Sequence, residues 1–547
     1  MELLEWMENK NSDDTSDGAY RITPLMRRIV AAAVCAVLIL IAFIYTAKSR
    51  TIYFWDDATY WDISRSVLSG ALKGGFWHKV YESIGTSDYN YVAALPSALW
   101  MRIFGISRIS YVMGLTIMYI IPSAALLYRL AARLSKAPML AYMAAIFIIP
   151  SLIFIAASGF ADVGALPMML GCYALYYPSK PERGASTRYI WIGVLLVFMM
   201  VYRRYFAFFS VSFITAMAMD CMLFGRKKRN FFITVLTAAL MLFTVFKPFL
   251  TGILIKDYGT LYSDYKYSIY TDFKLITRYF GSIFLITAAA VPFVSMTRRK
   301  DARPIFMWIQ IIVCAAMFMA TQTHGIQHLL LYIPSLSLLT MLFINCIRRQ
   351  NGLIALALLV AVNFVSPFIP RTQPTNIQDI KGLAFTPTFS MLPEKRDDTG
   401  DILRIKRKLD KVIPEWETCS VLASSFVIND SILRNVEPSL NVNINRDGDY
   451  IIALPCVDSR DYGRLEEIYT AQYILVATPA QTHLADGSQT IITEAVSSFV
   501  NYTDIATSFF EVYSFEDKIG DISVKLFQRV EEVNAVQKRD YENRLYK

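Results

Sequence analysis

The sequence predicts a polytopic α-helical membrane protein with about eleven transmembrane helices and a C-terminal α/β domain outside the membrane. Three observations predict this class. Hydrophobic residues make up 55% of the 547 residues. They occur in long runs of the length that crosses a bilayer. These runs stop near residue 369, after which prolines punctuate the chain and the pattern becomes that of a soluble domain.

The apolar runs define the predicted membrane part, residues 29–369. Several runs are shorter than the roughly 20 residues that a straight crossing needs, so we expect their helices to extend beyond them. The first run follows a long acidic stretch, which favours a retained span over a cleaved signal peptide. The predicted spans are residues 29–46, 109–130, 137–156, 161–178, 189–202, 205–224, 230–249, 282–297, 304–321, 326–347 and 352–369.

Basic residues occur in every second loop, which predicts the orientation of the spans. Loops rich in Lys and Arg stay in the cytoplasm. We therefore expect a cytoplasmic N-terminal tail (1–28) and an extracytoplasmic domain (370–547); only Lys48 and Arg50 argue mildly the other way. The formal net charge of +9 reflects this topology and does not indicate a nucleic-acid partner. The clusters are Arg27/Arg28, Arg129/Arg133/Lys136, Lys180/Arg183/Arg188, Arg226–Arg229, Arg298–Lys300 and Arg348/Arg349.

Residues 370–547 read as a small α/β domain, because helical periodicity alternates with short apolar runs. Two polar segments, 455–460 and 478–483, follow strand candidates directly. Strand ends are where α/β domains bind ligands, and a simple turn is the alternative for both. The predicted strands are 420–424, 450–455, 472–477, 509–515 and 522–529, and the predicted helices are 401–412, 462–469, 488–502 and 531–544.

The predicted topology places two long loops on the outer face, residues 48–108 and 250–281. The first carries Asp56 and Asp57 between aromatic residues. Ionisable groups at a membrane surface often mark functional sites; the alternative is a solvated loop with interfacial aromatics. On a helix the two side chains would point about 100° apart, so one is a candidate base. The other is a candidate for binding metal or acceptor.

Further polar residues fall on the same outer face. A carboxylate can take a proton from a hydroxyl, and cations can hold phosphate oxygens. This set therefore suits transfer of a sugar from a polyprenyl phosphate to an acceptor hydroxyl. The candidates are Asp162 as a third catalytic carboxylate, and Arg203, Arg204, Tyr262, Lys266, Gln322, His324 and His328 for substrate binding.

Each of these residues also has a simpler explanation. Asp162 could cap the N-terminus of the fourth span, and Arg203 and Arg204 could snorkel to lipid headgroups. The i, i+4 spacing of His324 and His328 permits a shared metal, but the pattern contains no third ligand. We therefore favour hydrogen bonding of these histidines to phosphate or acceptor.

The segment Asp56-Asp57-Ala58-Thr59-Tyr60 resembles the acidic first-loop motif of the GT-C superfamily of membrane glycosyltransferases, which includes protein O-mannosyltransferases and aminoarabinose transferases. Asp162 matches the family's second loop acid. Tyr202-Arg203-Arg204-Tyr205 is similar to a basic-aromatic pair in bacterial members, and residues 258–266 and 322–328 are similar to outer-loop motifs. The resemblance spans residues 27–370, and it implies a GT-C-like fold.

The resemblance also implies an activity: inverting, single-displacement transfer from a polyprenyl-phosphate sugar donor to a glycan or glycolipid acceptor at the cell membrane. Asp56 would be the general base. Some members use a divalent metal and others none; Asp57 and Asp162 are the candidate ligands here. The sequence departs from the family in having Asp at position 57 and no paired histidines at 327–328.

A transporter or flippase of a lipid-linked glycan is the alternative function. Such proteins carry charges or broken helices near the middle of the membrane, often in repeated halves. Most spans here lack central charges, and no repeat is visible. The gathering of carboxylates at one face therefore favours the enzyme.

Overall fold

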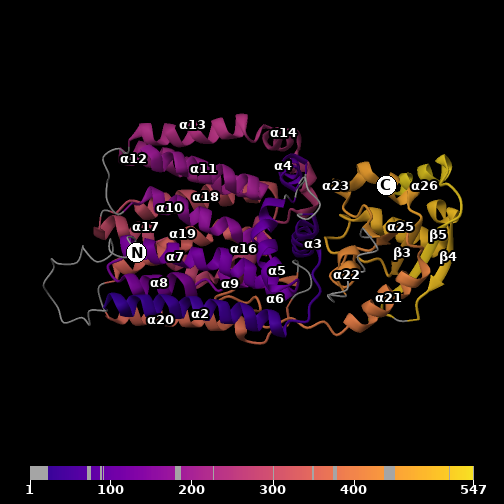
Figure 1. The fold of residues 1–547 in the computed structure, drawn as a ribbon, viewed down its shortest axis with the longest axis horizontal. Helices are drawn as coiled ribbons and strands as arrows, with labels where there is room; N and C mark the ends of the chain where they lie inside the picture. The colour runs from indigo at the N-terminus through magenta and orange to yellow at the C-terminus, as the bar shows by residue number, and fades with distance from the viewer. Residues whose placement is uncertain are drawn as a thin grey trace.

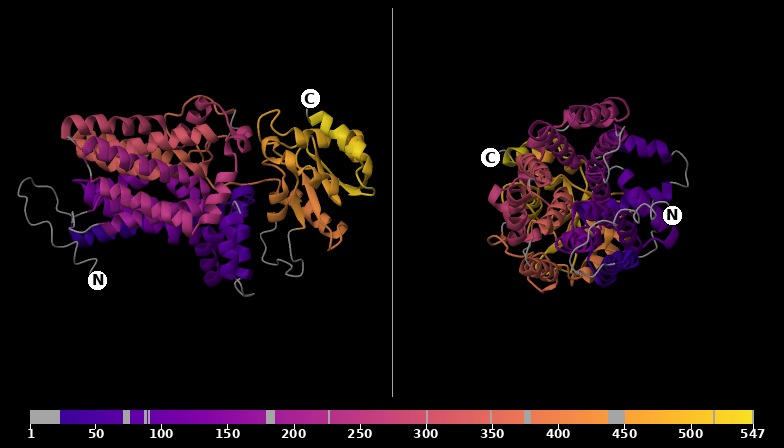
Figure 2. Two further views of the ribbon diagram at one scale, coloured as in Figure 1. Left: turned by 90° about the horizontal axis from the view of Figure 1, so that it is seen from above. Right: turned by 90° about the vertical axis from the view of Figure 1, so that its left-hand side faces the viewer.

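The computed structural model describes residues 23–545 except 71–75, 87–88, 90, 179–185, 226, 300, 348–349, 374–378, 437–449 and 517. A helical bundle and an α/β domain lie end to end (Figures 1 and 2). The N-terminal tail up to residue 22 and the basic residues Lys180, Arg183, Arg226, Lys300, Arg348 and Arg349 lie outside the described residues.

Each of the eleven predicted spans coincides with a helix or a helix pair. Among the described residues, five helices are long and apolar enough to cross a membrane, or up to eight if each bent pair is one span. The helices are α2 (Pro24–Lys48), α6 (Arg108–Leu115) continuing through Thr116–Ile120 into α7 (Ile121–Leu134), α8 (Pro138–Phe147), α9 (Ser151–Ala157), α10 (Ala165–Tyr176), α11 (Ser186–Tyr202), α12 (Ala207–Phe224), α13 (Lys228–Thr244), α17 (Ser282–Arg299), α18 (Arg303–Thr321), α19 (Ile333–Cys346) and α20 (Gln350–Val365).

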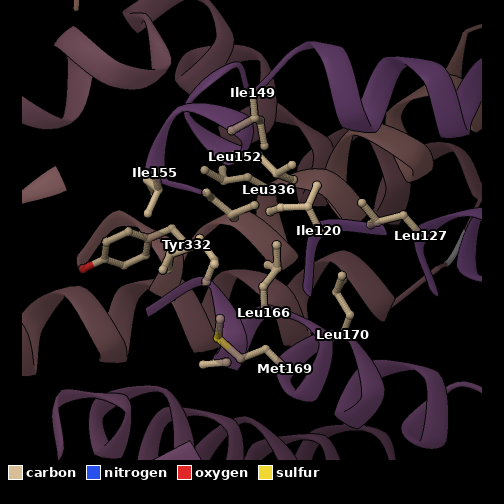
Figure 3. Packing of buried hydrophobic residues seen from close by; sticks show 14 of the residues in the cluster. Ile120, Leu127, Ile149, Leu152, Ile155, Leu166, Met169, Leu170, Tyr332 and Leu336 are labelled. Carbon is tan, nitrogen blue, oxygen red and sulfur yellow. The ribbon is translucent and has the colours of Figure 1, made fainter. Parts of the chain in front are cut away.

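The centre of the bundle is a packed core of aliphatic side chains. Figure 3 shows Leu166 and Leu170 of α10 facing Ile120 and Leu127 of the α6–α7 segment. All four are buried. Helix α19 is short for a span, but it is buried on nearly every side. Burial of this kind explains how a 14-residue helix stays in the bundle without a full crossing of its own.

The two long outer segments are largely helical, where the sequence predicts loops. Residues 48–108 contain α3 (Trp55–Gly70), α4 (Phe76–Thr86) and α5 (Leu95–Phe104), and residues 247–280 contain α14 (Lys247–Ile255), α15 (Tyr258–Leu261) and α16 (Ile269–Phe280). Helix α16 begins at the cap Ser268 and ends at Gly281, whose φ of 80° is a conformation that favours glycine. There the chain bends by 95° into α17.

The C-terminal domain is built on a five-stranded sheet of order β2-β1-β3-β5-β4. Strands β1 (Cys419–Leu422), β2 (Ile451–Ala453) and β3 (Tyr473–Thr478) are parallel, and β5 (Ser523–Arg529) is antiparallel to β3 and β4 (Phe509–Ser514). The five predicted strands are confirmed. The helices are α21 (Thr399–Val412), α22 (Asp430–Asn435), α23 (Asp458–Asp461), α24 (Glu466–Thr470), α25 (Thr490–Asn501) and α26 (Ala535–Leu545).

Helices cover both faces of this sheet, and alternate side chains of each strand point to opposite faces. Leu475 and Leu526 belong to the core that includes α21 and α22. Their neighbours Ile474 and Phe527 belong to the core that includes α25 and α26. Both faces are therefore buried at the centre of the sheet, which explains why β3 reads as a nearly continuous apolar run in the sequence.

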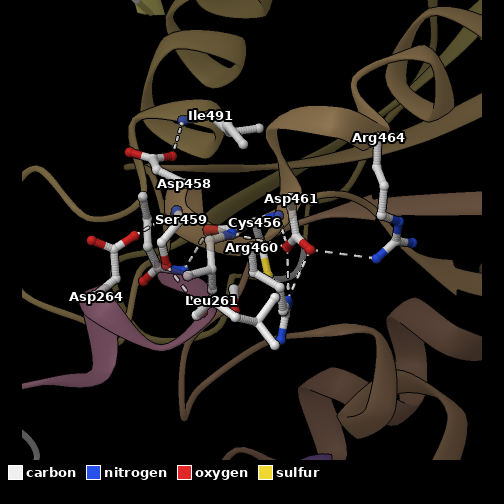
Figure 4. A network of polar contacts seen from close by, with 12 residues as sticks. Leu261, Asp264, Cys456, Asp458, Ser459, Arg460, Asp461, Arg464 and Ile491 are labelled. Atoms are coloured by element: carbon white, nitrogen blue, oxygen red, sulfur yellow. Dashed lines mark hydrogen bonds and ion pairs between the residues drawn. The ribbon is translucent and has the colours of Figure 1, made fainter. Parts of the chain in front are cut away.

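Two outer segments of the bundle are fastened to the α/β domain. Ile52, just before α3, is buried in the core of α21 and α22, and Phe54 packs against the same core. Asp264 accepts a hydrogen bond from the backbone N–H of Ser459 at 2.7 Å, and the Ser459 hydroxyl donates to the carbonyl of Leu261 at 3.3 Å (Figure 4). The domain is thus anchored at the end of the bundle that carries α3.

Candidate active site

Arg203 lies between two carboxylates from separate segments of the chain. Its Nε donates to Asp162 Oδ1 at 3.0 Å, and its Nη2 donates to Asp56 Oδ2 at 3.1 Å. The Arg203 side chain is 10% exposed, that of Asp162 is fully buried, and that of Asp56 is 26% exposed. The outer candidates Asp56, Asp162 and Arg203 are therefore brought together, and Asp56 is the carboxylate that solvent reaches.

The side chains of the neighbouring residues Asp56 and Asp57 have different partners. Asp57 Oδ1 accepts a hydrogen bond from the backbone N–H of Phe54 at 3.3 Å, so it caps the first turn of α3. Burial raises the pKa of the Asp57 carboxyl. Asp56 instead points toward Arg203. The sequence leaves the roles of the two residues open, and this geometry favours Asp56 as the reacting group.

Asp162 lies in the tight turn Ala161–Gly164 that precedes α10. Gly164 is required here, because a Cβ at this position would collide with the Tyr202 hydroxyl. That hydroxyl donates to the carbonyl of Ala161 at 2.5 Å, which draws the end of α11 against the turn. Asp162 Oδ1 accepts from Arg203, and within the described parts of the chain no helix N–H bonds to its side chain. The structure therefore does not support the alternative that Asp162 simply caps the N-terminus of the fourth span.

Two partners of Asp56 were not predicted from the sequence. Gln327 Nε2 donates to Asp56 Oδ2 at 3.1 Å, and the Tyr89 hydroxyl donates to Asp56 Oδ1. The Arg203 guanidinium also lies over the Tyr89 ring, 4.3 Å from its centroid. Position 327 lies where the family has a second histidine, and this was the one signal that could have pointed to Gln327.

Of the remaining basic candidates, Arg204 lies in the turn between α11 and α12, and Lys266 follows α15 in the chain. Arg204 is half-buried, and its Nη1 donates to the Tyr258 hydroxyl at 3.1 Å. Tyr258 stacks on Tyr262, with ring centroids 6.1 Å apart. Lys266 is exposed, and its Nζ donates to the carbonyl of Ala320 at 2.9 Å. Arg204 therefore contacts an aromatic side chain, Tyr258, in a segment that is separate from the Asp56 site.

His324 is held inside the protein. Its Nδ1 lies 2.8 Å from Asp272 Oδ1, and its Nε2 lies 2.6 Å from the Tyr332 hydroxyl. Both ring nitrogens thus have protein partners, and the side chain is fully buried.

Gln322 and His328 lie on either side of His324 in the sequence. Gly325 donates its backbone N–H to His328 Nδ1 at 2.8 Å, which leaves the proton of a neutral ring on Nε2. Gln322 is half-buried and follows the last residue of α18. Among the described residues, no group of three or more His, Cys, Asp or Glu side chains could hold a metal ion.

Comparisons with known proteins place the fold. No protein-family model matches the sequence, and no curated protein matches it significantly. The crystal structure of ArnT from Cupriavidus metallidurans bound to undecaprenyl phosphate matches with a TM-score of 0.58 at 11% identity, covering 91% of this chain and 97% of that chain. The apo form of the same protein matches over the same shares with a TM-score of 0.55 at 11% identity.

These matches show that the chain has the fold of ArnT, and its long apolar helices are those of a multi-pass membrane protein. The resemblance inferred from the first-loop motif is thereby confirmed at the level of the fold. At 11% identity, the likeness says nothing about individual residues.

Proposed function

We propose that the protein is a glycosyltransferase. It moves a sugar from a polyprenyl-phosphate donor to a hydroxyl of a cell-surface glycan or lipid-linked acceptor. One observation carries the proposal: the partly exposed Asp56 carboxylate is held in place by Arg203 and Gln327. The GT-C fold supports it, since ArnT of that fold was solved with undecaprenyl phosphate bound.

The chemistry is a single displacement at the anomeric carbon of the donor sugar. Asp56 takes the proton of the acceptor hydroxyl as that oxygen bonds to the anomeric carbon. The bond from this carbon to the phosphate oxygen breaks, and the polyprenyl phosphate leaves with the bonding electrons. Attack opposite to the leaving group inverts the anomeric configuration. Arg204 and Lys266 offer positive charge to the phosphate as it leaves.

Arg203 orients the base, and Asp162 in turn holds Arg203. The guanidinium is planar and permanently charged, so its Nη2 fixes Asp56 Oδ2 while its Nε is held by Asp162. The remaining oxygen, Oδ1, accepts only from Tyr89 among the described residues. A hydroxyl that replaces Tyr89 or shares Oδ1 with it would be in reach of the base.

We propose a transfer that needs no metal at the candidate ligands Asp57 and Asp162. Asp57 turns back to the N–H of Phe54, and Asp162 is already paired with Arg203. The positive charge between the carboxylates is therefore supplied by an arginine, and no step of the proposed transfer passes through a metal.

The orientation completes the proposal. We place residues 1–28 in the cytoplasm and residues 370–547 outside, because the described basic clusters alternate with the loops that carry the candidate site. Sugar transfer would then occur on the outer face of the cell membrane.

An in vitro transfer assay tests the function. Purified protein receives radiolabelled polyprenyl-phosphate sugars and a cell-envelope acceptor fraction, with and without a chelator. We expect label to move to glycan with the wild type, to stop with Asp56→Asn, and to continue within about tenfold with Asp57→Asn, whose role is a helix cap. Normal transfer by Asp56→Asn would remove Asp56 as the base. Movement of the labelled lipid between leaflets without any transfer would support the flippase.

A further inference from the structure

The α/β domain turns the carboxyl ends of its central strands toward the candidate site. Strand β1 connects through α22 to β2 on one side, whereas β3 continues through α25 to the strands on the other side. The loop after β1 and the loop after β3 therefore run in opposite directions along the sheet. Ligands of open α/β sheets bind at such a divergence. The second loop is the segment 478–483, which the proposed function leaves unused.

These loops are joined by hydrogen bonds and lie against α3. The Ser424 backbone N–H donates to the carbonyl of Gln481 at 2.9 Å, and the Ser425 hydroxyl donates to Gln481 Oε1 at 3.0 Å. The His483 ring lies on Trp55, the first residue of α3, with ring centroids 4.3 Å apart. The strand-end loops thus touch the residue that directly precedes the proposed base.

Phe426 and Trp55 form an aromatic surface at this contact. Their ring centroids are 5.0 Å apart, at an interplanar angle of 69°. Phe426 is 46% exposed, although it lies among other aromatic rings. An exposed aromatic ring at a built interface is typical of a ligand contact. Phe426 therefore contacts Trp55, the residue that precedes Asp56 in the chain.

His483, whose ring contacts both Trp55 and Phe426, adds a hydrogen-bond acceptor to this aromatic cluster. Its Nδ1 lies 2.9 Å from the Ser424 carbonyl, which can only accept, so Nδ1 carries the proton. The neutral ring therefore has a lone pair on Nε2, and none of the described residues bonds to that atom. Burial lowers the pKa of His483 to about 4, so the ring is neutral near pH 7.

The backbone that carries this surface is fixed from both sides. Trp55 has a φ of 50°, which is strained for a bulky residue. Its neighbour Phe54 packs against the core of α21 and α22, in which Ile52 is buried. The α/β domain therefore holds the start of α3 in a conformation that the segment would not adopt alone.

We propose that Phe426 and His483, with Trp55 beneath them, form a binding subsite for the acceptor saccharide. The exposed ring of Phe426 packs against the apolar face of a sugar ring. Nε2 of His483 accepts a hydrogen bond from a sugar hydroxyl. The proposal rests on the proposed function, since the surface contacts Trp55, which precedes the base Asp56 in the chain. A saccharide fits because the surface combines aromatic rings with an uncharged acceptor.

Saccharide binding by the full-length protein tests the subsite separately from transfer. The protein is placed in lipid nanodiscs, which avoids sugar-headed detergents. Saturation-transfer NMR is recorded with the methyl glycosides of glucose, galactose, mannose and N-acetylglucosamine. We expect at least one glycoside to receive saturation from the wild type. Its affinity should fall about fivefold or more in Phe426→Ala and in His483→Phe, which keeps a ring on Trp55 but removes the acceptor nitrogen.

Phe510→Ala is the matched control. Phe510 is an aromatic residue of β4, 64% exposed, at the edge of the sheet far from the bundle (Figure 1), so its loss should leave binding unchanged. Asp56→Asn should also keep binding while it loses transfer, so failure of the base assignment and failure of the subsite are distinguishable. The subsite is overturned if no glycoside binds the wild type. It is equally overturned if Phe426→Ala and His483→Phe bind as the wild type does.

Discussion

Arg203 receives its two carboxylate partners from segments that are distant in the sequence, and it follows directly after α11. A buried charge is costly unless it is paired and hydrogen-bonded. Here the guanidinium has one carboxylate on Nε, another on Nη2, and the Tyr89 ring over its face. The cation is thus built into the site, and its geometry depends on the forked shape of arginine.

Replacement of Arg203 by lysine should therefore impair the reaction although it keeps the charge. A lysine ammonium is a point charge and cannot reproduce the two fixed edges of a guanidinium. We expect Arg203→Lys to lower kcat/KM about 100-fold, measured in the transfer assay. Arg102→Lys, an exposed residue of α5, serves as the control. Transfer at the wild-type rate by Arg203→Lys would show that orientation of Asp56 does not depend on this side chain.

Helix α16 and the segment after α18 are locked together by one buried cluster. Asp272 of α16 accepts from the His324 backbone N–H at 3.0 Å and pairs with its ring. Thr323 adds a second link, since its hydroxyl accepts from the Tyr267 N–H at 2.8 Å. The same segment carries Gln327, which contacts Asp56. The cluster therefore sets the position of one partner of the base.

Loss of His324 should destabilise the protein as well as the site. His324→Phe fills the space but leaves the buried Asp272 carboxyl without its ring partner, which costs about 3 kcal/mol. We expect a lower melting temperature and a reduced kcat, because Gln327 loses its support. His78→Phe replaces an exposed histidine and should change neither. If His324→Phe melts as the wild type does and only raises KM for the donor, His324 contacts substrate instead.

Pattern and topology are enough to predict much of the architecture from the sequence, because long apolar runs and short β runs are local features. The alternation of basic loops alone predicts that Asp56, Asp162 and Arg203 share one face of the membrane. Tyr89, Gln327 and Asp272 were missed, since a single sequence does not reveal which polar residues converge. The helix α16 was missed because its apolar residues mark only one face, within a segment rich in Tyr, Asp and Lys.

At the scale of the whole molecule, the α/β domain forms part of the proposed active site. It buries Ile52 ahead of α3, contacts the segment around Asp264, and touches Trp55 through His483. Arg460 reinforces the same interface: it donates to the Tyr265 hydroxyl at 3.2 Å and pairs with Asp461 at 2.8 Å. Burial alone would raise the pKa of the Asp461 carboxyl, but this pairing holds the pKa below its usual range.

The folded protein, with its α/β domain against the bundle, should therefore be less stable in mild acid because His483 takes up a proton on unfolding. Burial, with the nearby Arg460 charge, lowers its pKa from 6.5 to about 4. Between these values the unfolded chain binds a proton that the folded chain does not, so stability rises with pH across this window and is lost as pH falls from 6.5 toward 4. The full difference corresponds to about 3 kcal/mol.

A variant comparison isolates this contribution from the other groups that titrate in the same range. Melting temperatures of the wild type and His483→Gln are measured in nanodiscs at pH 7 and pH 5. We expect the wild type to lose several degrees more than the variant, since glutamine takes up no proton and about 2 kcal/mol of the effect is present by pH 5. Equal losses would mean that His483 is as free to protonate in the folded protein as in the unfolded chain. The contact between the strand-end loops and Trp55 would then not shield His483 from protonation.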